Sequence, residues 1–195
     1  TDFKGDTVNA TEKIENVSYH FSHQNPQDTS LINYQEIYNF NSLKKYEEMA
    51  ISRLVSVGKE TKPLAIHSAS NFVVGLAGAR AAKALGIPSI YEIRGFWHLT
   101  QSTKREGYDS SDHYRLSERF EIETAKESDY VFTITQALKD ILVENGVDQD
   151  KISVLPNAVD SSKFNIAPKD KKLESKLGFE GKVVIGYIGS FVEYE

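Results

Sequence analysis

The sequence of 195 residues contains no cysteine, which excludes disulfides, thiolate zinc sites and cysteine nucleophiles. It also lacks a basic run: 23 lysines and arginines are spread along the chain against 28 aspartates and glutamates, for a net charge of −5. Nothing in this pattern attracts a polyanion, so we expect no nucleic-acid partner. No stretch approaches the ~18 consecutive apolar residues of a membrane-spanning helix, and the start shows no secretory signal pattern. We therefore expect a cytoplasmic protein, with at most a peripheral contact at the inner face of the membrane.

The remaining composition, 39% apolar and 26% charged, is typical of a globular protein with room for one sizeable core. Both ends of the chain are unusual. Thr1 is not an initiator residue, and the apolar run that begins at Lys182 has no helix after it to cover it. Because a parallel strand is normally buried on both faces, we expect a chain truncated at both ends.

Apolar residues recur at helix and strand spacings in alternation. The spacing predicts helices over 43–57 (with a stop at Gly58), 71–85, 112–127 and 136–145. Short apolar runs predict strands over 64–67, 89–93, 130–134 and 152–155, with a weaker candidate edge strand over 17–21. In the helix over 112–127, we expect Leu116, Phe120 and Thr124 to share one apolar face. The alternation predicts an α/β fold with a Rossmann-like parallel sheet flanked by helices.

The composition turns polar after Pro156 and stays polar until Lys182. We therefore divide the chain into a partial N-terminal Rossmann-like domain over 1–155, an interdomain linker over 156–181, and the first strand and glycine loop of a truncated second domain over 182–195.

The first candidate site residues follow the strand over 64–67, because ligands of open α/β sheets bind beyond the carboxyl ends of the strands. His67 and Ser70 lie there, before a helix rich in glycine and alanine that can approach the sheet closely. His67 could position or deprotonate a hydroxyl, or it could be a polar residue hydrogen-bonded at a strand end.

Arg94, Gly95 and Trp97, the only tryptophan, follow the strand over 89–93. The planar guanidinium of Arg94 suits phosphate oxygens, and Trp97 could stack on the apolar face of a sugar ring. Alternatively, Arg94 pairs with Glu92 and Trp97 fills a place in the core. The sequence leaves both interpretations open.

Two further groups lie toward the end of the chain. Asn157 and Asp160 form a corner after the fourth strand, where Asp160 can cap the next turn and Phe164 can anchor the chain in apolar surface. Gly189 and Ser190 end the last apolar run, where bare backbone amides can approach a diphosphate.

These segments, taken in order, resemble the family-four glycosyltransferases, retaining enzymes of the GT-B fold, over roughly residues 64–195. The segments are Ile66-His67-Ser68-Ala69-Ser70, Tyr91-Glu92-Ile93-Arg94-Gly95-Phe96-Trp97, the helix and strand from Glu121 to Thr135, Leu155-Pro156-Asn157-Ala158-Val159-Asp160 with Phe164, and Val184 to Ser190.

The resemblance implies two Rossmann-like domains facing a cleft, with the acceptor bound mainly by the first and the nucleotide sugar by the second. It implies hexosyltransferase-type transfer, with retention, from a nucleotide-diphosphate sugar to a glycan or lipid acceptor, as in polysaccharide biosynthesis. No cofactor and no metal are expected, because cationic side chains and helix amides stabilise the leaving diphosphate. The implied roles are Arg94 as the catalytic residue, His67, Ser70, Gly95 and Trp97 on the acceptor side, Gly189 and Ser190 on the donor side, and Asn157 and Asp160 at the interdomain corner.

The chain departs from the family pattern at Ala69, in place of a second histidine, and at Ala158, in place of a glycine. The family's glycine-rich loop should precede Thr1, and its Arg-x-x-x-x-Lys and paired-glutamate motifs should follow Glu195. We therefore expect this polypeptide alone to have no measurable glycosyl transfer, and turnover of a sugar nucleotide by it would refute this.

Two alternatives stay open. One is a non-catalytic α/β module that binds a small anion or sugar, and the other is a GT-B epimerase acting on a sugar nucleotide.

Overall fold

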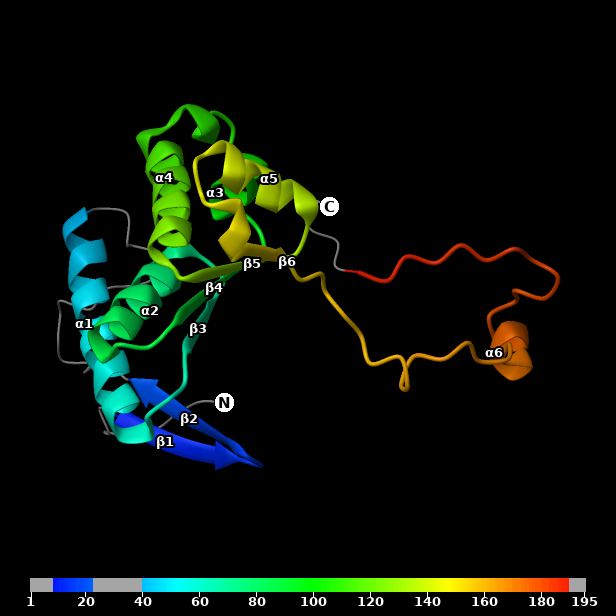
Figure 1. Ribbon diagram of the computed structural model, residues 1–195. Helices are drawn as coiled ribbons and strands as arrows, with labels where there is room; N and C mark the ends of the chain where they lie inside the picture. The colour runs from blue at the N-terminus through cyan, green and yellow to red at the C-terminus, as the bar shows by residue number, and fades with distance from the viewer. Residues whose placement is uncertain (1–8, 23–39, 190–195) are drawn as a thin grey trace, which may run out of the picture. The chain divides into compact units, whose positions relative to one another are not determined.

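The computed structural model describes residues 9–22 and 40–189 (Figure 1). The chain divides into two units, Thr1–Leu155 and Pro156–Glu195, and each is described here by itself. The first unit contains β1 (Asn9–Ile14), β2 (Val17–Ser22), α1 (Phe40–Thr61), β3 (Ile66–Ala69), α2 (Phe72–Leu85), β4 (Ser89–Ile93), α3 (Trp97–Ser102), η2 (Tyr108–Ser110), α4 (Asp112–Glu127), β5 (Tyr130–Thr133), α5 (Gln136–Glu144), η3 (Gln149–Lys151) and β6 (Ile152–Val154).

Four parallel strands form the centre of the first unit, in the order β3-β4-β5-β6. Helices connect them, so the predicted α/β fold with a parallel sheet flanked by helices is confirmed (Figure 1). Their order along the chain equals their order in the sheet, and all four carboxyl ends therefore meet at one edge. The predicted strand over 17–21 exists as β2, but it pairs with β1 in a separate antiparallel hairpin.

The helices cover one face of this sheet. Tyr91, Ile93 and Val131 point to that face and form the core with Ala125 of α4 and Leu142 of α5. Alternate residues of the same strands point the other way, and among the described residues that second face stays partly exposed. It carries His67, Ile90, Glu92 and Phe132.

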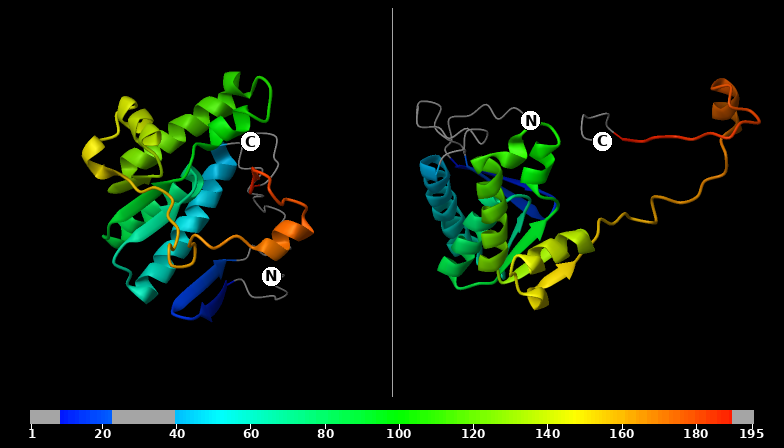
Figure 2. Two further views of the ribbon diagram at one scale, coloured as in Figure 1. Left: turned by 90° about the vertical axis from the view of Figure 1, so that its right-hand side faces the viewer. Right: turned by 90° about the horizontal axis from the view of Figure 1, so that it is seen from above.

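Helix α2 packs between α1 and α4 and lies directly on the sheet (Figure 2). Its glycines make this approach possible: a Cβ on Gly78 would lie 1.9 Å from Oγ of Ser68, and one on Gly75 would lie 2.6 Å from the ring of Tyr91. The helix ends at Gly86, whose φ of 68° is the left-handed conformation of a helix C-cap. The small residues of this helix therefore set the distance between helix and sheet.

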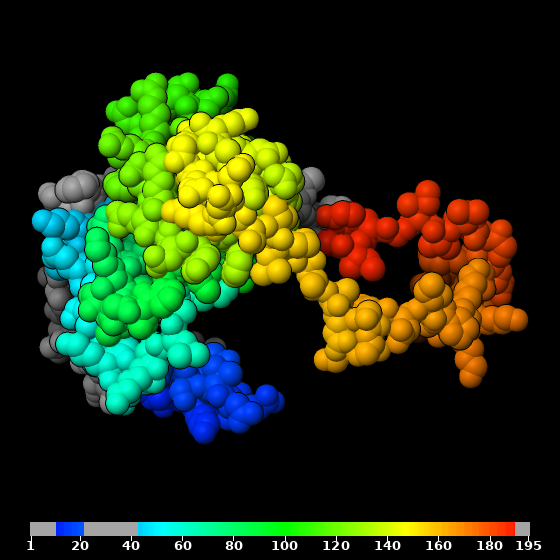
Figure 3. Space-filling view, in the orientation of Figure 1, coloured from blue at the N-terminus to red at the C-terminus, as the bar shows by residue number. Residues whose placement is uncertain are grey.

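Hydrogen bonds on the outside of the first unit link the end of α4 to η3, the segment before β6. Nζ of Lys151 in η3 donates hydrogen bonds to the carbonyl oxygens of Lys126 (2.8 Å) and Ser128 (2.9 Å). In the space-filling view, the green helix α4 and the yellow segment around η3 accordingly lie side by side (Figure 3). None of the helices in the described ranges has the length and apolar character needed to cross a membrane.

Three local predictions for the first unit are wrong. Helix α1 does not stop at Gly58 but runs on to Thr61, because Gly58 serves close packing: a Cβ there would lie 2.3 Å from Leu85. Strand β3 starts at Ile66, and Leu64 before it is almost fully exposed. On α4, Leu116 is exposed, and the buried positions are Ser117, Glu121, Thr124 and Ala125.

The second unit contains one described helix, α6 (Lys171–Lys176), which is capped by Oδ1 of Asp170 through the amides of Lys172 and Leu173. The strand expected from Lys182 is not formed over 182–188. A strand needs a neighbour to satisfy its backbone groups, and no partner strand occurs in the described part of this unit. The prediction that Phe164 is anchored in apolar surface is also wrong, since 71% of its surface is exposed.

Candidate functional site

Glu92 of β4 links two of the residues expected at the site. Its Oε2 lies 2.9 Å from Nε2 of His67 on β3, and its Oε1 accepts a 2.7 Å hydrogen bond from Nε of Arg94, just after β4. The Glu92 side chain is 16% exposed, whereas those of His67 and Arg94 are 45% and 63% exposed. The three side chains thus form one polar cluster that solvent can reach, near the carboxyl edge of the sheet.

This cluster corrects the position predicted for His67. The histidine does not follow β3 but is its second residue, beside Ile90 in the parallel register. Its ring lies on the sheet face away from the helices and makes an edge contact with Phe132 of β5, at 6.1 Å between ring centres. The prediction failed because β3 begins two residues later than its apolar pattern suggested.

The charges within the cluster favour an ionised Glu92. The hydrogen bond from Arg94 is the largest influence that lowers the pKa of Glu92, and the charge of Arg94, together with that of His67 when it is protonated, adds to it. An ionised carboxylate can only accept hydrogen bonds, so Nε2 of His67 carries the proton in this contact. In a neutral imidazole, Nδ1 is then an acceptor, which is the arrangement that lets a histidine take a proton from a hydroxyl.

Arg94 and the residues after it offer open binding surface. Arg94 uses only its Nε on Glu92, and its two terminal nitrogens make no hydrogen bond to any described residue. A Cβ built on Gly95 would meet no atom within 4 Å, so the space beside that residue is open. The next residues include Trp97, which is 44% exposed. A guanidinium, an open backbone position and an aromatic surface therefore follow one another within four residues.

These contacts decide between the two interpretations of this loop. The alternative in which Arg94 pairs with Glu92 describes the structure, although the pairing leaves the terminal nitrogens available. The alternative in which Trp97 fills the core is wrong, because its neighbours Phe96 and His98 do so, each 4% exposed. Burial of His98, which packs edge-on against Tyr114, lowers its pKa to about 4 and keeps it neutral.

Ser70 joins the cluster through its backbone. Its amide donates to the carbonyl oxygen of Glu92 (3.1 Å), and its carbonyl oxygen accepts from the hydroxyl of Tyr91 (3.1 Å). Its φ of 103° is rare for a residue other than glycine and marks a tight turn between β3 and α2. The structure thus brings His67, Ser70 and Arg94 together around Glu92.

The remaining expected site residues belong to the second unit or lie outside the described residues. Oδ1 of Asp160 accepts hydrogen bonds from the amide (3.0 Å) and the hydroxyl (2.6 Å) of Ser162 and so caps the turn after it. Asn157 and Gly189 are exposed in the same unit. Ser190 lies outside the described residues. The structure does not place these residues relative to the Glu92 cluster.

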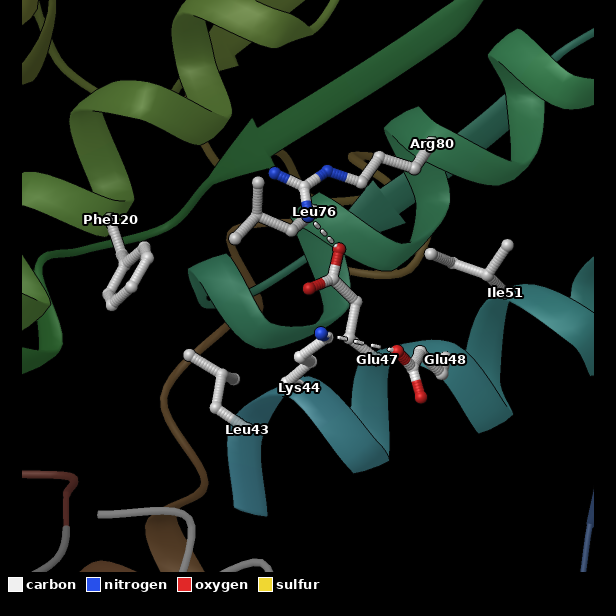
Figure 4. A pocket seen from close by; sticks show the side chains of 8 residues that line it. All are labelled: Leu43, Lys44, Glu47, Glu48, Ile51, Leu76, Arg80 and Phe120. Carbon is white, nitrogen blue, oxygen red and sulfur yellow. Dashed lines mark hydrogen bonds and ion pairs between the residues drawn. The ribbon is translucent and has the colours of Figure 1, made fainter. Parts of the chain in front are cut away.

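A pocket of about 360 Å³ lies elsewhere in the first unit, between α1, α2 and α4 (Figure 4). Arg80 on its wall is already engaged: it binds Glu47 of α1 and both carboxylate oxygens of Glu127 on α4, at 2.8 and 3.0 Å. The lining contains none of the expected site residues; it consists of Leu43, Lys44, Glu47, Glu48, Ile51, Leu76, Arg80 and Phe120. We therefore assign the candidate site to the Glu92 cluster.

A family model described as Glycosyltransferase Family 4 matches residues 22–163. The chain belongs to this family. The match covers the sheet, the Glu92 cluster and the loop with Trp97, so the family resemblance carried by these segments is confirmed at the level of a glycosyltransferase-type α/β domain. Among curated proteins, the search finds no match.

Two solved structures are similar to part of this chain. A co-structure of S. aureus MnaA with UDP is 18% identical, with a TM-score of 0.46, and the match covers 70% of this chain and 34% of that one. A UDP-GlcNAc 2-epimerase from Neisseria meningitidis bound to UDP-GlcNAc is 22% identical, with a TM-score of 0.43 and coverage of 61% and 30%. The chain thus spans about a third of the length of these structures, and the likeness concerns the fold alone.

Proposed function

We propose that this chain is the acceptor-side part of a retaining, hexosyltransferase-type glycosyltransferase, which moves a sugar from a nucleotide-diphosphate donor to a glycan or lipid acceptor. The observation that carries the proposal is the family match over residues 22–163, which includes every residue of the Glu92 cluster. Polysaccharide or glycolipid synthesis at the inner face of the membrane is the setting that such acceptors suggest.

Arg94 is the proposed catalytic residue. Its terminal nitrogens are open to an anion, and a fixed positive charge beside the reacting atoms stabilises negative charge that develops on a departing diphosphate. Glu92 keeps this guanidinium in place from the opposite side. In this mechanism the cationic group takes the part that a metal ion has in other transferases, so we propose that no metal and no other cofactor are required.

His67 and the loop beyond Arg94 form the proposed acceptor side. The carboxylate of Glu92 orients the His67 ring, and Nδ1 of that ring can then accept a hydrogen bond from an acceptor hydroxyl. The exposed ring of Trp97 provides an apolar surface for a sugar, and Gly95 leaves room near the backbone. Ser70 is proposed to contact the acceptor from the turn after β3. In the second unit, Gly189 and Ser190 are proposed to approach the donor diphosphate, and Asn157 and Asp160 to form the corner between the domains.

The test is product analysis with the protein expressed from its complete open reading frame. It is incubated with a panel of nucleotide sugars and with glycan or lipid acceptors, and the linkage formed is examined by NMR. The proposal predicts a product that keeps the donor's anomeric configuration, formed at the same rate with and without a metal chelator. Interconversion of sugar nucleotides without an acceptor would show an epimerase instead, and tight ligand binding without turnover would show a binding module.

A further inference from the structure

Glu121 of α4 is a carboxyl group in the fully closed interior of the first unit. No part of its surface is exposed. Its Oε1 accepts a 3.2 Å hydrogen bond from the amide of Phe72, the first residue of α2, and its Oε2 makes a short contact with the hydroxyl of Tyr91. The same hydroxyl contacts the carbonyl oxygen of Ser70. Glu121 therefore lies behind the Ser70 turn and connects it to the start of a helix.

The hydrogens available for these hydrogen bonds indicate whether Glu121 is protonated. The Tyr91 hydroxyl has one hydrogen and lies within hydrogen-bond distance of two of the described oxygens, the Ser70 carbonyl oxygen and Oε2 of Glu121. The carbonyl oxygen of Ser70 can only accept, so the Tyr91 hydrogen must point there for that bond to exist. The contact between Tyr91 and Glu121 then needs a hydrogen from Glu121. All three contacts are satisfied together only when Glu121 is protonated.

The surroundings of Glu121 favour the same state. Among the described residues, Tyr91 of β4 is the titratable group in contact with Glu121, and α2 contacts it through the amide of Phe72. The nearby arginine of α2, Arg80, points away to Glu47 and Glu127. Among the described residues no cation contacts Glu121, and burial raises the pKa of Glu121 to about 7, against the smaller opposing effect of its contacts with Tyr91 and Phe72.

We propose that Glu121 is a positioning residue whose proton, passed on through the Tyr91 hydroxyl, holds the Ser70 turn in place behind the candidate site. When the proton is lost, the Tyr91 hydroxyl turns to the carboxylate, because a charged acceptor binds it more strongly than a neutral carbonyl oxygen does. The carbonyl oxygen of Ser70 then loses its hydrogen bond, in a turn whose φ of 103° needs support. The role concerns the scaffold of the site and does not depend on which reaction the site performs.

The experiment is an NMR titration of the chain between acid and alkaline pH, with carbon-13 at the glutamate side-chain carboxyls and nitrogen-15 at the amides. The carboxyl signal that Glu121→Gln removes is assigned to Glu121. We expect this signal to titrate with a midpoint near 7, well above the usual 4.5 of a glutamate, and the amide signals of Ser70 and Phe72 to follow with the same midpoint.

Three variants separate the parts of the proposal. In Glu121→Gln, whose amide copies the protonated acid, the Ser70 and Phe72 signals should no longer titrate near pH 7. In Tyr91→Phe, the amide signal of Phe72 should still titrate together with the Glu121 carboxyl, and the amide signal of Ser70 should not. Glu123→Gln, on the exposed side of the same helix, should leave the titrations of Glu121, Ser70 and Phe72 unchanged. An ordinary carboxyl midpoint for Glu121, a Ser70 signal that still titrates in Glu121→Gln, or one that still follows Glu121 in Tyr91→Phe would overturn the proposal.

Discussion

Glu92 determines the geometry of the candidate site at the scale of single residues. One carboxylate oxygen binds the guanidinium of Arg94 and the other binds the imidazole of His67. Because the carboxylate is mostly covered, it holds two more exposed side chains in fixed directions. The sequence places Arg94 two residues after Glu92 and so suggested their pairing, but it could not show that His67, on another strand, shares the same partner.

We predict that Arg94→Gln raises the pKa of Glu92. The hydrogen bond from Arg94 is the largest influence that lowers this pKa. A neutral glutamine lacks the positive charge of Arg94 and makes a weaker hydrogen bond to a carboxylate. A carboxyl NMR titration of Glu92 in wild type and variant measures the change. Arg115→Gln is the matched control, because Arg115 is also an exposed arginine paired with a nearby carboxylate, that of Asp112. An unchanged Glu92 titration in Arg94→Gln would mean that the pair contributes nothing in solution.

We also predict that Glu121 makes the stability of the protein depend on pH. With a pKa of about 7 when folded and an ordinary value of 4.5 when unfolded, Glu121 keeps a proton in the folded chain that the unfolded chain releases between these values. The free energy of unfolding therefore falls as pH rises through this interval. Glu121→Gln lacks this loss, so the variant should gain up to about 3 kcal/mol relative to wild type between acid and neutral pH.

The measurement is denaturant unfolding of both proteins at a series of pH values. Only the difference between them is informative, because His98, whose pKa is lowered, changes stability in the opposite direction with pH in both proteins. A difference that stays constant from acid to neutral pH would show that Glu121 titrates normally in the folded chain.

At the scale of elements, α2 determines how the site is supported. Its first amide binds Glu121, its glycines let it lie on β3 and β4, and the turn before it carries Ser70. Glycine is unfavourable in a helix by about 0.5–1 kcal/mol relative to alanine, so the close packing at Gly75 and Gly78 must offset this cost. The helix is therefore built to fit the sheet closely.

Gly75→Ala should destabilise the protein. The added Cβ would lie 2.5 Å from Cγ2 of Thr124 and 2.6 Å from Cε2 of Tyr91, and both residues are fully buried. Overpacking of this kind costs about 1–3 kcal/mol, which exceeds the gain in helix propensity. Urea unfolding measures it, with Gly95→Ala as the control, since that position is open and should change stability by less than about 0.5 kcal/mol. Equal stability of the two variants would contradict the packing described here.

Most elements of the first unit could be predicted from the sequence, and the reasons are local. The strand over 89–93 and the helix over 112–127 have the predicted bounds, because apolar spacing and helix caps act within a few residues. The buried face of α4 could not be predicted: Glu121 is buried through contacts with Tyr91 and Phe72, which are distant in sequence, whereas the apolar Leu116 is left outside. The strand expected from Lys182 needs a partner strand to form, and the described residues of the second unit provide none.

At the scale of the whole molecule, the parallel order β3-β4-β5-β6 directs four carboxyl ends to one edge, and the Glu92 cluster lies near that edge. Because β3 and β4 are neighbours in this order, His67 and Glu92 lie side by side although they are far apart in the sequence. His67 and Arg94 lie together through their common contact with Glu92, although His67 is part of β3 and does not follow it as expected. Asn157 belongs to the second unit, and its role at the interdomain corner stays a prediction.

The most direct test of this account is the rate of sugar transfer by the protein from its complete reading frame, compared between wild type, Arg94→Ala and Arg115→Ala. If Arg94 stabilises the departing diphosphate, its loss should lower kcat by about 100-fold or more while circular dichroism and unfolding stay unchanged. Arg115→Ala should keep the rate within about twofold of wild type, because an exposed local ion pair contributes little. A folded Arg94→Ala enzyme that transfers sugar at the wild-type rate would contradict the assignment of the site.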